Sequence, residues 1–446
     1  MFELIFSDRL DPDHELMRAA KLIDWDGLHE TLGRYYSPRG RSGKPIRMMV
    51  GIHILKHRYN CSDERAVEEL RENAYWQCFC GFKAFQTGDI VDATSLVKFR
   101  NRIGREGMRL IEETVTRAWR AHGLVKTKRV LVDTTSQPKN IAYPTDADLL
   151  HKVREKIVKK VKEVCKEVAF RRPFRSFGRK GKQVLLHVKK LCRHKPEARK
   201  EAVKAIKVMT DRVISQSAKM VNSLYARGYN KLARELNRLV SVGKRVVGQT
   251  EKVLAGEKPA KRIYSLHEPK VAAIKKGKAH PSCEFGSIVS LAINEDGLIL
   301  SHKEYQENVA DVKTLAPLLQ RVERTTGERP QEAAADRGFD QSLEKQERMR
   351  KRLKLKRLSI PKKGKKPHPE SEQPWFKRGQ RRRVKIEPVI GHLKNDHRLN
   401  RCRYRGPQGD TTNVVWATLA WNIKKITRLA HRKEEKLTSR RSKQAA

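Results

Sequence analysis

Two short apolar segments that each run directly into an aspartate constrain the fold more than any other feature. The first, "VLVD", reaches Asp133, and the second, "AAAD", reaches Asp336. Apolar runs of this length are typical of short buried strands, and we expect each strand to end at its aspartate. If the two strands are neighbours in one sheet, both carboxylates lie at one edge. A single strand-terminal aspartate is more often a turn or cap residue, so the pair needs further support.

The chain between these segments is helical and strongly basic. Residues 146–262 have apolar side chains at helical spacing, and Thr145 with Asp148 forms a capping-box pattern at their start. Residues 151–250 contain 29 Lys and Arg but only 7 Asp and Glu. Strands resume near residue 285, where "GSIVSLAINEDGLILSHKEY" predicts two strands joined by an Asp-Gly turn. The pattern therefore predicts a separate, basic helical block between the first strand and the strands near residue 285.

The charge of the whole chain indicates a polyanionic partner. The 446 residues include 99 Lys and Arg and 51 Asp and Glu, a formal net charge of +48. Nucleic acid is the leading candidate, since each neutralised phosphate releases counterions, although a membrane surface or ribosomal RNA would fit the charge alone. No apolar run approaches the roughly 20 residues that a spanning helix needs. We expect a soluble, intracellular protein without a membrane partner.

The first 125 residues are expected to form several short helices in series, one of which has Ser62 as its N-cap. One of them, "DATSLVKFRNRIG", begins near Thr94 or Ser95 and carries Lys98, Arg100 and Arg102. Such a series with one basic helix suits a helix-turn-helix reader of DNA. A plain helical bundle with a solvated basic face is the alternative, and the sequence leaves both open.

A third carboxylate, Glu387, lies in "RRRVKIEPVIGHLKNDHRL", which we expect to be one helix. Arg383, Glu387 and Lys394 follow at steps of four and seven, so they share a face of that helix. Two Asp and one Glu offer hard oxygen ligands to Mg²⁺. Two such ions, about 3.5–4 Å apart, stabilise both the attacking and the leaving oxygen in phosphodiester chemistry. A Glu between Arg and Lys is alone more often a surface ion-pair set, so the conjunction of three acids carries the hypothesis.

These motifs resemble the DDE transposases of bacterial insertion sequences, and most closely the insertion-sequence-five family. The resemblance rests on "VDTTSQPKNIAYPTDADLLHK", "ADRGFD" and "RRRVKIEPVIGHLKNDHRLNRCRYRG", and it extends over most of the chain. The family signature Tyr-x2-Arg-x3-Glu-x6-Lys is matched by Arg383, Glu387 and Lys394, whereas Gln380 replaces the Tyr. The segment "NVAD" and Arg337 lie near these motifs, but the sequence assigns them no role.

The resemblance implies an α/β fold with a ribonuclease-H-like, retroviral-integrase-like catalytic domain. That domain would comprise residues 126–145 and 263–430, interrupted by the basic helical insertion of residues 146–262. Residues 1–125 would form an N-terminal helical DNA-binding domain. Residues 431–446 are expected to be a charged, disordered tail.

The resemblance also implies a function and a set of site residues. Asp133, Asp336 and Glu387 would be the catalytic acids and would hold Mg²⁺ or Mn²⁺, with two ions expected. The expected DNA-binding residues are Arg383, Lys394, Arg398, Lys98, Arg100 and Arg102. Water would cleave a phosphodiester at the element's end, and the freed 3′-hydroxyl would then attack target DNA.

The expected partners are double-stranded DNA, as terminal inverted repeats and target, and a second copy of the chain in a homodimer. We expect the protein in the bacterial cytoplasm, associated with the nucleoid. A nuclease or resolvase of the same fold, a non-catalytic DNA-binding remnant or architectural protein, and an RNA-binding protein are the alternatives.

Overall fold

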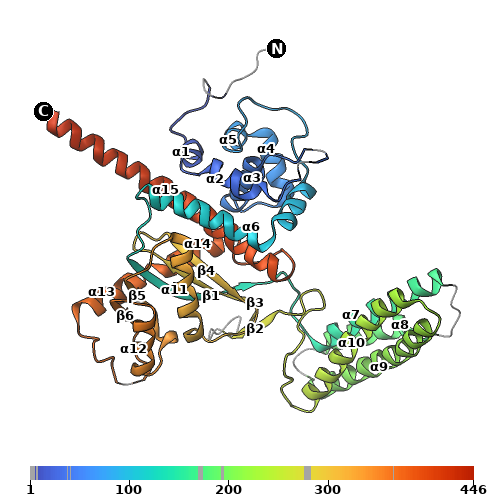
Figure 1. Ribbon diagram of the computed structural model, residues 1–446. Helices are drawn as coiled ribbons and strands as arrows, with labels where there is room; N and C mark the ends of the chain where they lie inside the picture. The colour runs from blue at the N-terminus through green and yellow to red at the C-terminus, as the bar shows by residue number, and fades with distance from the viewer. Residues whose placement is uncertain are drawn as a thin grey trace. The chain divides into compact units, whose positions relative to one another are not determined.

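The computed structural model divides the chain into two compact units (Figure 1). It describes residues 6, 9–37, 39–40, 42–168, 174–191, 195–275, 283–364 and 366–445, without the side chains from residue 436 onward. One unit comprises Met1–Asn140 together with Ile274–Ala446, and the other comprises Ile141–Ala273. No helix among the described residues combines the length and the apolar character that crossing a membrane requires.

In the described part of the chain, six helices precede the first strand. They are α1 Glu15–Lys21, α2 Trp25–Gly33, α3 Ile46–Arg58, α4 Asp63–Glu72, α5 Ala74–Phe79 and α6 Ala93–Ala121. Ser62 caps α4 as expected, because its hydroxyl accepts a hydrogen bond from the amide of Arg65 at 3.1 Å. At α6 the cap is Asp92 rather than Thr94 or Ser95, since Asp92 Oδ1 accepts from the amide of Thr94 at 2.7 Å.

The described strands form one mixed sheet in the order β2-β3-β1-β5-β6, and β4 also pairs with β3. The strands are β1 Arg129–Pro138, β2 Ala272–Lys275, β3 Cys283–Ile293, β4 Ile299–Tyr305, β5 Glu332–Ala334 and β6 Arg357–Ser359. Strand β1 is antiparallel to β3 and parallel to β5. The expected strand pair around the Asp-Gly turn is confirmed as β3 and β4.

Strand β1 does not end at Asp133, so that expectation was wrong. It continues to Pro138, and Thr135, Ser136 and Gln137 are 7%, 1% and 0% exposed while they pair with β3. Polar residues are accommodated there because they find partners inside the protein; Gln137 Oε1 accepts from Asn413 Nδ2 at 2.8 Å. What ends near Asp133 is the neighbouring strand, since the last pair between β1 and β5 joins Leu131 to Ala334.

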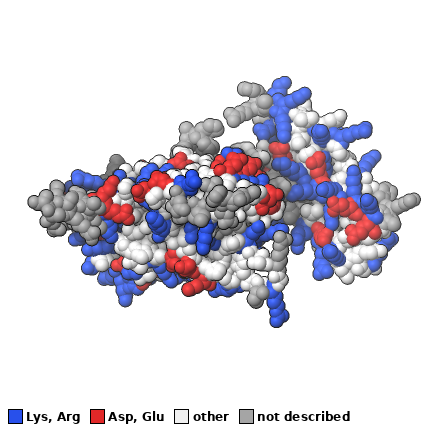
Figure 2. All heavy atoms as spheres, turned by 90° about the horizontal axis from the view of Figure 1, so that it is seen from above, with Lys and Arg blue, Asp and Glu red and all other residues white. Residues whose placement is uncertain are grey.

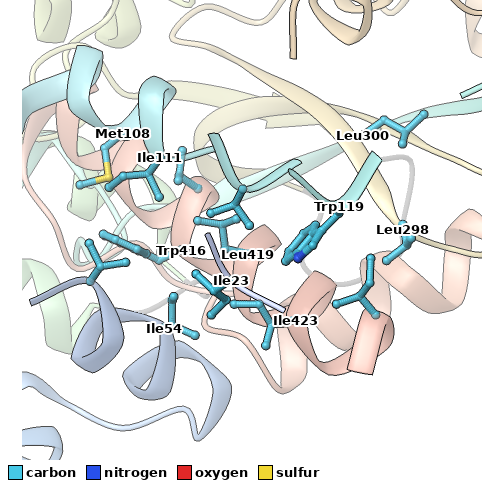
Figure 3. Close-up of a cluster of buried hydrophobic side chains, with 14 of the residues drawn as sticks. Ile23, Ile54, Met108, Ile111, Trp119, Leu298, Leu300, Trp416, Leu419 and Ile423 are labelled. Atoms are coloured by element: carbon cyan, nitrogen blue, oxygen red, sulfur yellow. The ribbon is translucent and has the colours of Figure 1, made fainter. Parts of the chain in front are cut away.

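Helices cover both faces of this sheet. Val130 and Val132 of β1 belong to the same core as α11 (Val312–Thr326), whereas Leu131 belongs to the core that includes Ile386. Successive strand residues point to opposite faces, which explains the alternation. Figure 3 shows how the first core joins the N-terminal helices to the sheet: Trp119 of α6 and Trp416 of the C-terminal helix lie among the same apolar side chains as Leu300 of β4.

The C-terminal part is helical but is interrupted at one point. Its helices are α12 Leu343–Arg352, α13 Pro374–Arg383, α14 Ile386–Asn395 and α15 Gly406–Ala445. The expected single helix through Arg383 and Glu387 is therefore two helices, broken at residues 384–385. Pro388 explains the break, because its ring has no N–H and clashes with the carbonyl of the residue four positions earlier. We expected a disordered tail from residue 431, whereas α15 continues to Ala445.

The second unit consists of four helices in its described residues. They are α7 Asp146–Glu167, α8 Gly178–Lys190, α9 Pro196–Ala226 and α10 Asn230–Leu254, and they enclose an apolar core of their own. The expected capping box is confirmed: the amide of Asp148 donates to Thr145 Oγ1 at 3.1 Å, and that hydroxyl bonds Asp148 Oδ2 at 2.6 Å.

Basic side chains dominate the surface of the protein. Figure 2 shows Lys and Arg distributed over the visible face, with smaller groups of Asp and Glu between them. A surface of this kind attracts polyanions over its whole extent rather than at one point.

Candidate active site

Asp133 and Asp336 lie together because their strands are parallel neighbours. The pair Leu131–Ala334 is two residues before each aspartate, so both carboxylates lie where β5 has stopped and β1 continues. Asp336 starts a short 3-10 helix, Arg337–Phe339, and its Oδ1 accepts from the amide of Gly338 at 2.9 Å. Burial raises the pKa of Asp133 to about 6, and the nearby charge of Asp336 contributes to the rise.

Glu387 is joined to Asp133 through Arg383. Arg383 Nη1 lies 3.6 Å from Asp133 Oδ2, and its Nη2 lies 3.2 Å from Glu387 Oε1. Arg383 is the last residue of α13, and Glu387 lies in the first turn of α14, where the helix dipole favours an acid. Lys394 of α14 donates to Ser136 Oγ of β1 at 3.4 Å. The three residues of the expected signature therefore gather beside β1 although two helices carry them.

The acids at this site are of the donor type that a hard divalent cation takes, but their arrangement in this structure is not that of a metal site. Among the residues that the structure describes, no three His, Cys, Asp or Glu side chains are arranged to hold a metal ion. The guanidinium of Arg383 is the cation between Asp133 and Glu387 in this arrangement. Carboxylate oxygens are the ligands that Mg²⁺ and Mn²⁺ take. Asp133, Asp336 and Glu387 would hold such an ion once Arg383 had released Glu387, whose side chain is 59% exposed.

Gly338 packs against the carboxylates of Asp336 and Asp311, where a side chain would not fit. A Cβ added at Gly338 would lie 2.9 Å from Asp336 Oδ1 and 2.5 Å from Oδ2 of Asp311, the residue just before α11. Asp311 belongs to the segment "NVAD", to which the sequence alone assigns no role. The sequence evidence for a functional role of Asp311 is weak, because a single Asp before a helix is usually an N-cap residue.

Gln380, which replaces the signature Tyr, connects α13 to the sheet through hydrogen bonds. Its Nε2 lies 3.2 Å from the carbonyl oxygen of Ala335, and 2.9 and 2.8 Å from the carbonyl and hydroxyl oxygens of Ser359. Ala335 directly follows β5 and precedes Asp336, and Ser359 is the last residue of β6. Gln380 therefore positions the last turn of α13, which carries Arg383, against the strand that leads to Asp336.

The other expected DNA-binding residues lie elsewhere in the same unit. Arg100 is 6% exposed and donates to both carboxylate oxygens of Asp63, at 2.9 and 2.7 Å. Arg398 donates to the carbonyl oxygen of Cys61 at 2.6 Å. Both arginines line an open cavity of about 590 Å³, which is also lined by the basic side chains of Lys56, Arg401, Arg403 and Arg405.

Lys98 and Arg102 of α6 are exposed and line a different, smaller hollow. The guanidinium of Arg102 lies 4.8 Å from the ring centroid of Tyr36, a cation–π distance. The structure therefore brings Arg383 and Lys394 to the acids, and does not bring the basic residues of α6 there.

Comparison with known proteins identifies the family. Residues 4–102 match the family described as Transposase domain (DUF772), and residues 260–423 match the family described as Transposase DDE domain. The chain belongs to the insertion-sequence DDE transposases. A Rhizobium meliloti protein named "Uncharacterized protein ORF8 in nfe locus" is 41% identical to this transposase over 166 residues, 36% of this chain and 80% of the relative. No solved structure matches the chain.

The matched ranges include only part of the proposed site. The transposase DDE match includes Asp336, Arg383 and Glu387, whereas Asp133 lies outside both matched ranges. Its place beside Asp336 follows instead from the strand pairing in the structure of this transposase. The basic helices α7, α8, α9 and α10 also lie outside the two matches.

Proposed function

We propose that this transposase binds the terminal inverted repeats of its element and catalyses metal-dependent DNA cleavage and strand transfer. The observation that carries the proposal is the parallel pairing of β1 with β5, which puts Asp133 beside Asp336. The contacts of Arg383 with Asp133 and Glu387 add the third acid. Family membership supports the assignment as a transposase. The strand pairing and the contacts of Arg383 support the choice of these three acids as the catalytic residues.

We infer a ribonuclease-H-like catalytic domain formed by residues 126–145 and 263–430. Support comes from a central β1 with antiparallel β3 and β4 on one side and parallel β5 and β6 on the other. Residues 1–125 would then bind DNA, and the basic insertion of residues 146–262 would contact its backbone.

The chemistry assigned to this site is phosphodiester transfer without a covalent enzyme intermediate. When bound, Mg²⁺ or Mn²⁺, one ion or two, would stabilise charge on the attacking and leaving oxygens. Asp133, Asp336 and Glu387 would hold the cation, and Arg383 and Lys394 would bind backbone phosphate. A water oxygen attacks the phosphorus and the 3′ oxygen leaves as a hydroxyl. That hydroxyl then attacks a target phosphodiester and displaces the target's own 3′ oxygen.

We also propose that the active form is a homodimer on DNA, because two ends must be cut together, and that it acts in the bacterial cytoplasm at the nucleoid. Membership of the insertion-sequence-five family stays a prediction.

An excision assay in cells tests the proposal, with a reporter flanked by the DNA that surrounds this gene. Wild-type protein should excise the reporter, whereas Asp133→Asn, Asp336→Asn and Glu387→Gln should each reduce excision to background while DNA binding in a mobility-shift assay persists. Glu372→Gln, at an exposed acid away from the site, is the matched control. Full excision by any one of the three acid variants would remove that acid from the site. A folded wild-type protein that binds DNA but never excises would favour the non-catalytic DNA-binding alternative.

A further inference from the structure

The open cavity of about 590 Å³ at the start of α4 is lined mainly by basic side chains. Six Lys or Arg side chains line it, against the two acids Asp63 and Glu64. A concave surface with such an excess of one sign concentrates its electric field and attracts anions. A cavity of this size holds a ligand of several chemical groups rather than a single small ion.

Two of the six cations are used within the protein. Lys56 Nζ lies 2.6 Å from Asp63 Oδ1, and Arg100 donates to both oxygens of that carboxylate at 2.9 and 2.7 Å. Both basic side chains are buried. The ring centroid of Tyr404 lies 5.0 Å from Lys56 Nζ and 4.7 Å from the guanidinium carbon of Arg100. Lys56 and Arg100 are therefore part of the cavity wall, where they hold Tyr404 in place.

Arg401, Arg403 and Arg405 differ from these two, because all three are exposed while they line the same cavity. Within the part of the chain that the structure describes, no acid lies at ion-pair distance from any of the three guanidinium groups. Alternate residues of an extended segment lie on the same side. The three arginines therefore form a row of uncompensated charges, which suits an extended polyanion better than one compact anion.

This arginine segment is held against β1, the strand that carries Asp133. The amide of Cys402 donates to the carbonyl oxygen of Pro138, the last residue of β1, at 2.7 Å. Asn413 of the cavity wall donates to Gln137 Oε1 at 2.8 Å. Gln137 is four residues beyond Asp133, which is about 13 Å along an extended strand, or roughly four base pairs of B-DNA.

Arg398 joins the cavity wall to α14, the helix that carries Glu387. Its φ of 67° lies in the left-handed region, which residues other than glycine rarely adopt. Its guanidinium donates to the carbonyl oxygen of Cys61 at 2.6 Å, and its own carbonyl oxygen accepts from Asn413 Nδ2 at 3.1 Å. Strained backbone held by such contacts is concentrated at binding sites. Burial lowers the pKa of Arg398 and the charge of Arg403 adds to the lowering, so a bound anion would stabilise the charged guanidinium.

We propose that Arg401, Arg403 and Arg405 bind backbone phosphates of double-stranded DNA in this cavity, a few base pairs from the phosphodiester at Asp133. The inference rests on the proposed function, which supplies DNA as the partner. Phosphate is the group that fits, because guanidinium groups bind it in preference to base faces. Tyr404 is the one aromatic side chain among the described residues that line the cavity, and its ring already lies against two cations. Phosphate contacts fix the register of a duplex, so this row would set how far the cleaved bond lies from the DNA that the N-terminal helices hold.

Fluorescence anisotropy with the full-length protein and a labelled duplex from the DNA that flanks this gene tests this inference across a salt series. The cavity triple variant combines Arg401→Gln, Arg403→Gln and Arg405→Gln. The plot of log affinity against log salt concentration should become shallower by roughly 2.7, which is about 0.9 for each lost phosphate contact. Affinity should fall about 10- to 100-fold at physiological salt, and by nearly the same factor for an unrelated duplex.

A second triple variant serves as the matched control. It combines Arg352→Gln, Lys354→Gln and Lys356→Gln, which remove the same charge at the same spacing from exposed residues that do not line the cavity. Its salt slope should change by less than about one. Replacing the three cavity arginines by lysine keeps the charge, so the slope of that variant should also stay within about one of the wild type.

The outcomes separate this inference from the proposed function. A cavity triple variant with the wild-type salt slope overturns the inference and leaves DNA as the partner. Equal losses in the control triple variant overturn it as well, because net charge alone would then explain the result. A wild type that binds no duplex DNA removes the inference together with the proposed function. A loss confined to a single-stranded RNA probe would assign the cavity to RNA and overturn its assignment to DNA. Thermal unfolding of each variant, followed by tryptophan fluorescence, verifies that it is folded.

Discussion

The buried ion pair between Lys139 and Asp410 determines how firmly the end of β1 is held. Lys139 directly follows β1, and its Nζ lies 2.7 Å from Asp410 Oδ1, with side chains only 2% and 1% exposed. The same ammonium donates to the carbonyl oxygens of Tyr404 at 2.9 Å and Gly406 at 3.1 Å. The pair therefore connects the strand that carries Asp133 to the start of α15.

Replacing Lys139 by Met should cost this unit about 3–5 kcal/mol in its free energy of unfolding at pH 7. The methionine fills the space but leaves the Asp410 carboxylate buried without its cation, and it removes the ammonium that donates to the carbonyl oxygens of Tyr404 and Gly406. Replacing both members of the pair, as Lys139→Met with Asp410→Leu, removes the buried charge as well. The double variant should therefore recover much of the loss.

The cost should also depend on pH. Burial raises the pKa of Asp410 above its usual value, while Lys139 acts to lower it. Without Lys139 the pKa in the folded protein rises further, so Asp410 stays neutral over a wider range of pH. An acid with a raised folded pKa loses stability as pH increases from the unfolded pKa to the folded one. Lys139→Met should therefore differ less from the wild type at pH 4 than at pH 7.

Urea unfolding followed by tryptophan fluorescence measures this unit alone. All six Trp residues of the chain lie within Met1–Asn140 or Ile274–Ala446, and the unit of basic helices has none. Lys377→Met is the control, because its partner Glu372 is 84% exposed and such pairs contribute little; we expect it within about 0.5 kcal/mol of wild type. A loss below about 1 kcal/mol for Lys139→Met, or the same loss at both pH values, would refute the reasoning.

Two further predictions concern other parts of the same unit. Burial alone would lower the pKa of His302, but Glu112 and Glu304 raise it to about 9, so its stabilising charge is complete below pH 6.5 and lost as pH rises through 9. The melting temperature of the wild type should therefore fall more steeply between pH 6.5 and 9.5 than that of His302→Gln, and equal slopes would contradict this. Gln380→Ala frees the last turn of α13 from β5 and β6, so excision should fall by roughly tenfold to a hundredfold with DNA binding kept. Gln380→Glu, which cannot donate, should behave alike, and wild-type excision by both would show that Gln380 does not position Arg383.

Local sequence patterns correctly predicted helix caps and tight turns, because each of these features depends on one residue type at one position. The cap at Ser62, the capping box at Thr145 and Asp148, and the Asp-Gly turn between β3 and β4 all occur as expected. Gly327 likewise ends α11 with a positive φ of 74°, as its place after the apolar pattern predicts. Each of these features is decided within a few residues of chain.

Features that depend on partners distant in sequence could not be predicted in this way. The polar residues after Asp133 predicted a strand end, because nothing in the sequence shows that Asn413 and β3 would satisfy them. Arg383 and Glu387 still form an ion pair across the break between α13 and α14. The prediction that they lie together assumed one continuous helix, which the structure does not have. The hydrogen bond from Thr134 to Asp311 was not predicted, because only the fold brings these two residues together.

The sheet also explains how the chain accommodates a large insertion beside its acids. The end of β1, just before the insertion, is hydrogen-bonded to β3, which follows the insertion: the amide of Lys139 donates to the carbonyl oxygen of Phe285 at 2.8 Å. Pro138 pairs with Gly286 in the register of β1 and β3. Gly286 is required at this point, because a Cβ there would lie 2.0 Å from the carbonyl oxygen of Gln137.

Because β1 is held by its own pairing with β3, we expect the length and charge of the insertion to vary without moving Asp133. The basic helices can therefore be altered to change DNA affinity while the arrangement of the acids is kept. Replacing exposed lysines of α9 by glutamine should weaken DNA binding, most of all at low salt, and leave Mn²⁺ binding unchanged. A parallel loss of Mn²⁺ binding would show that the insertion and the acid site are not independent.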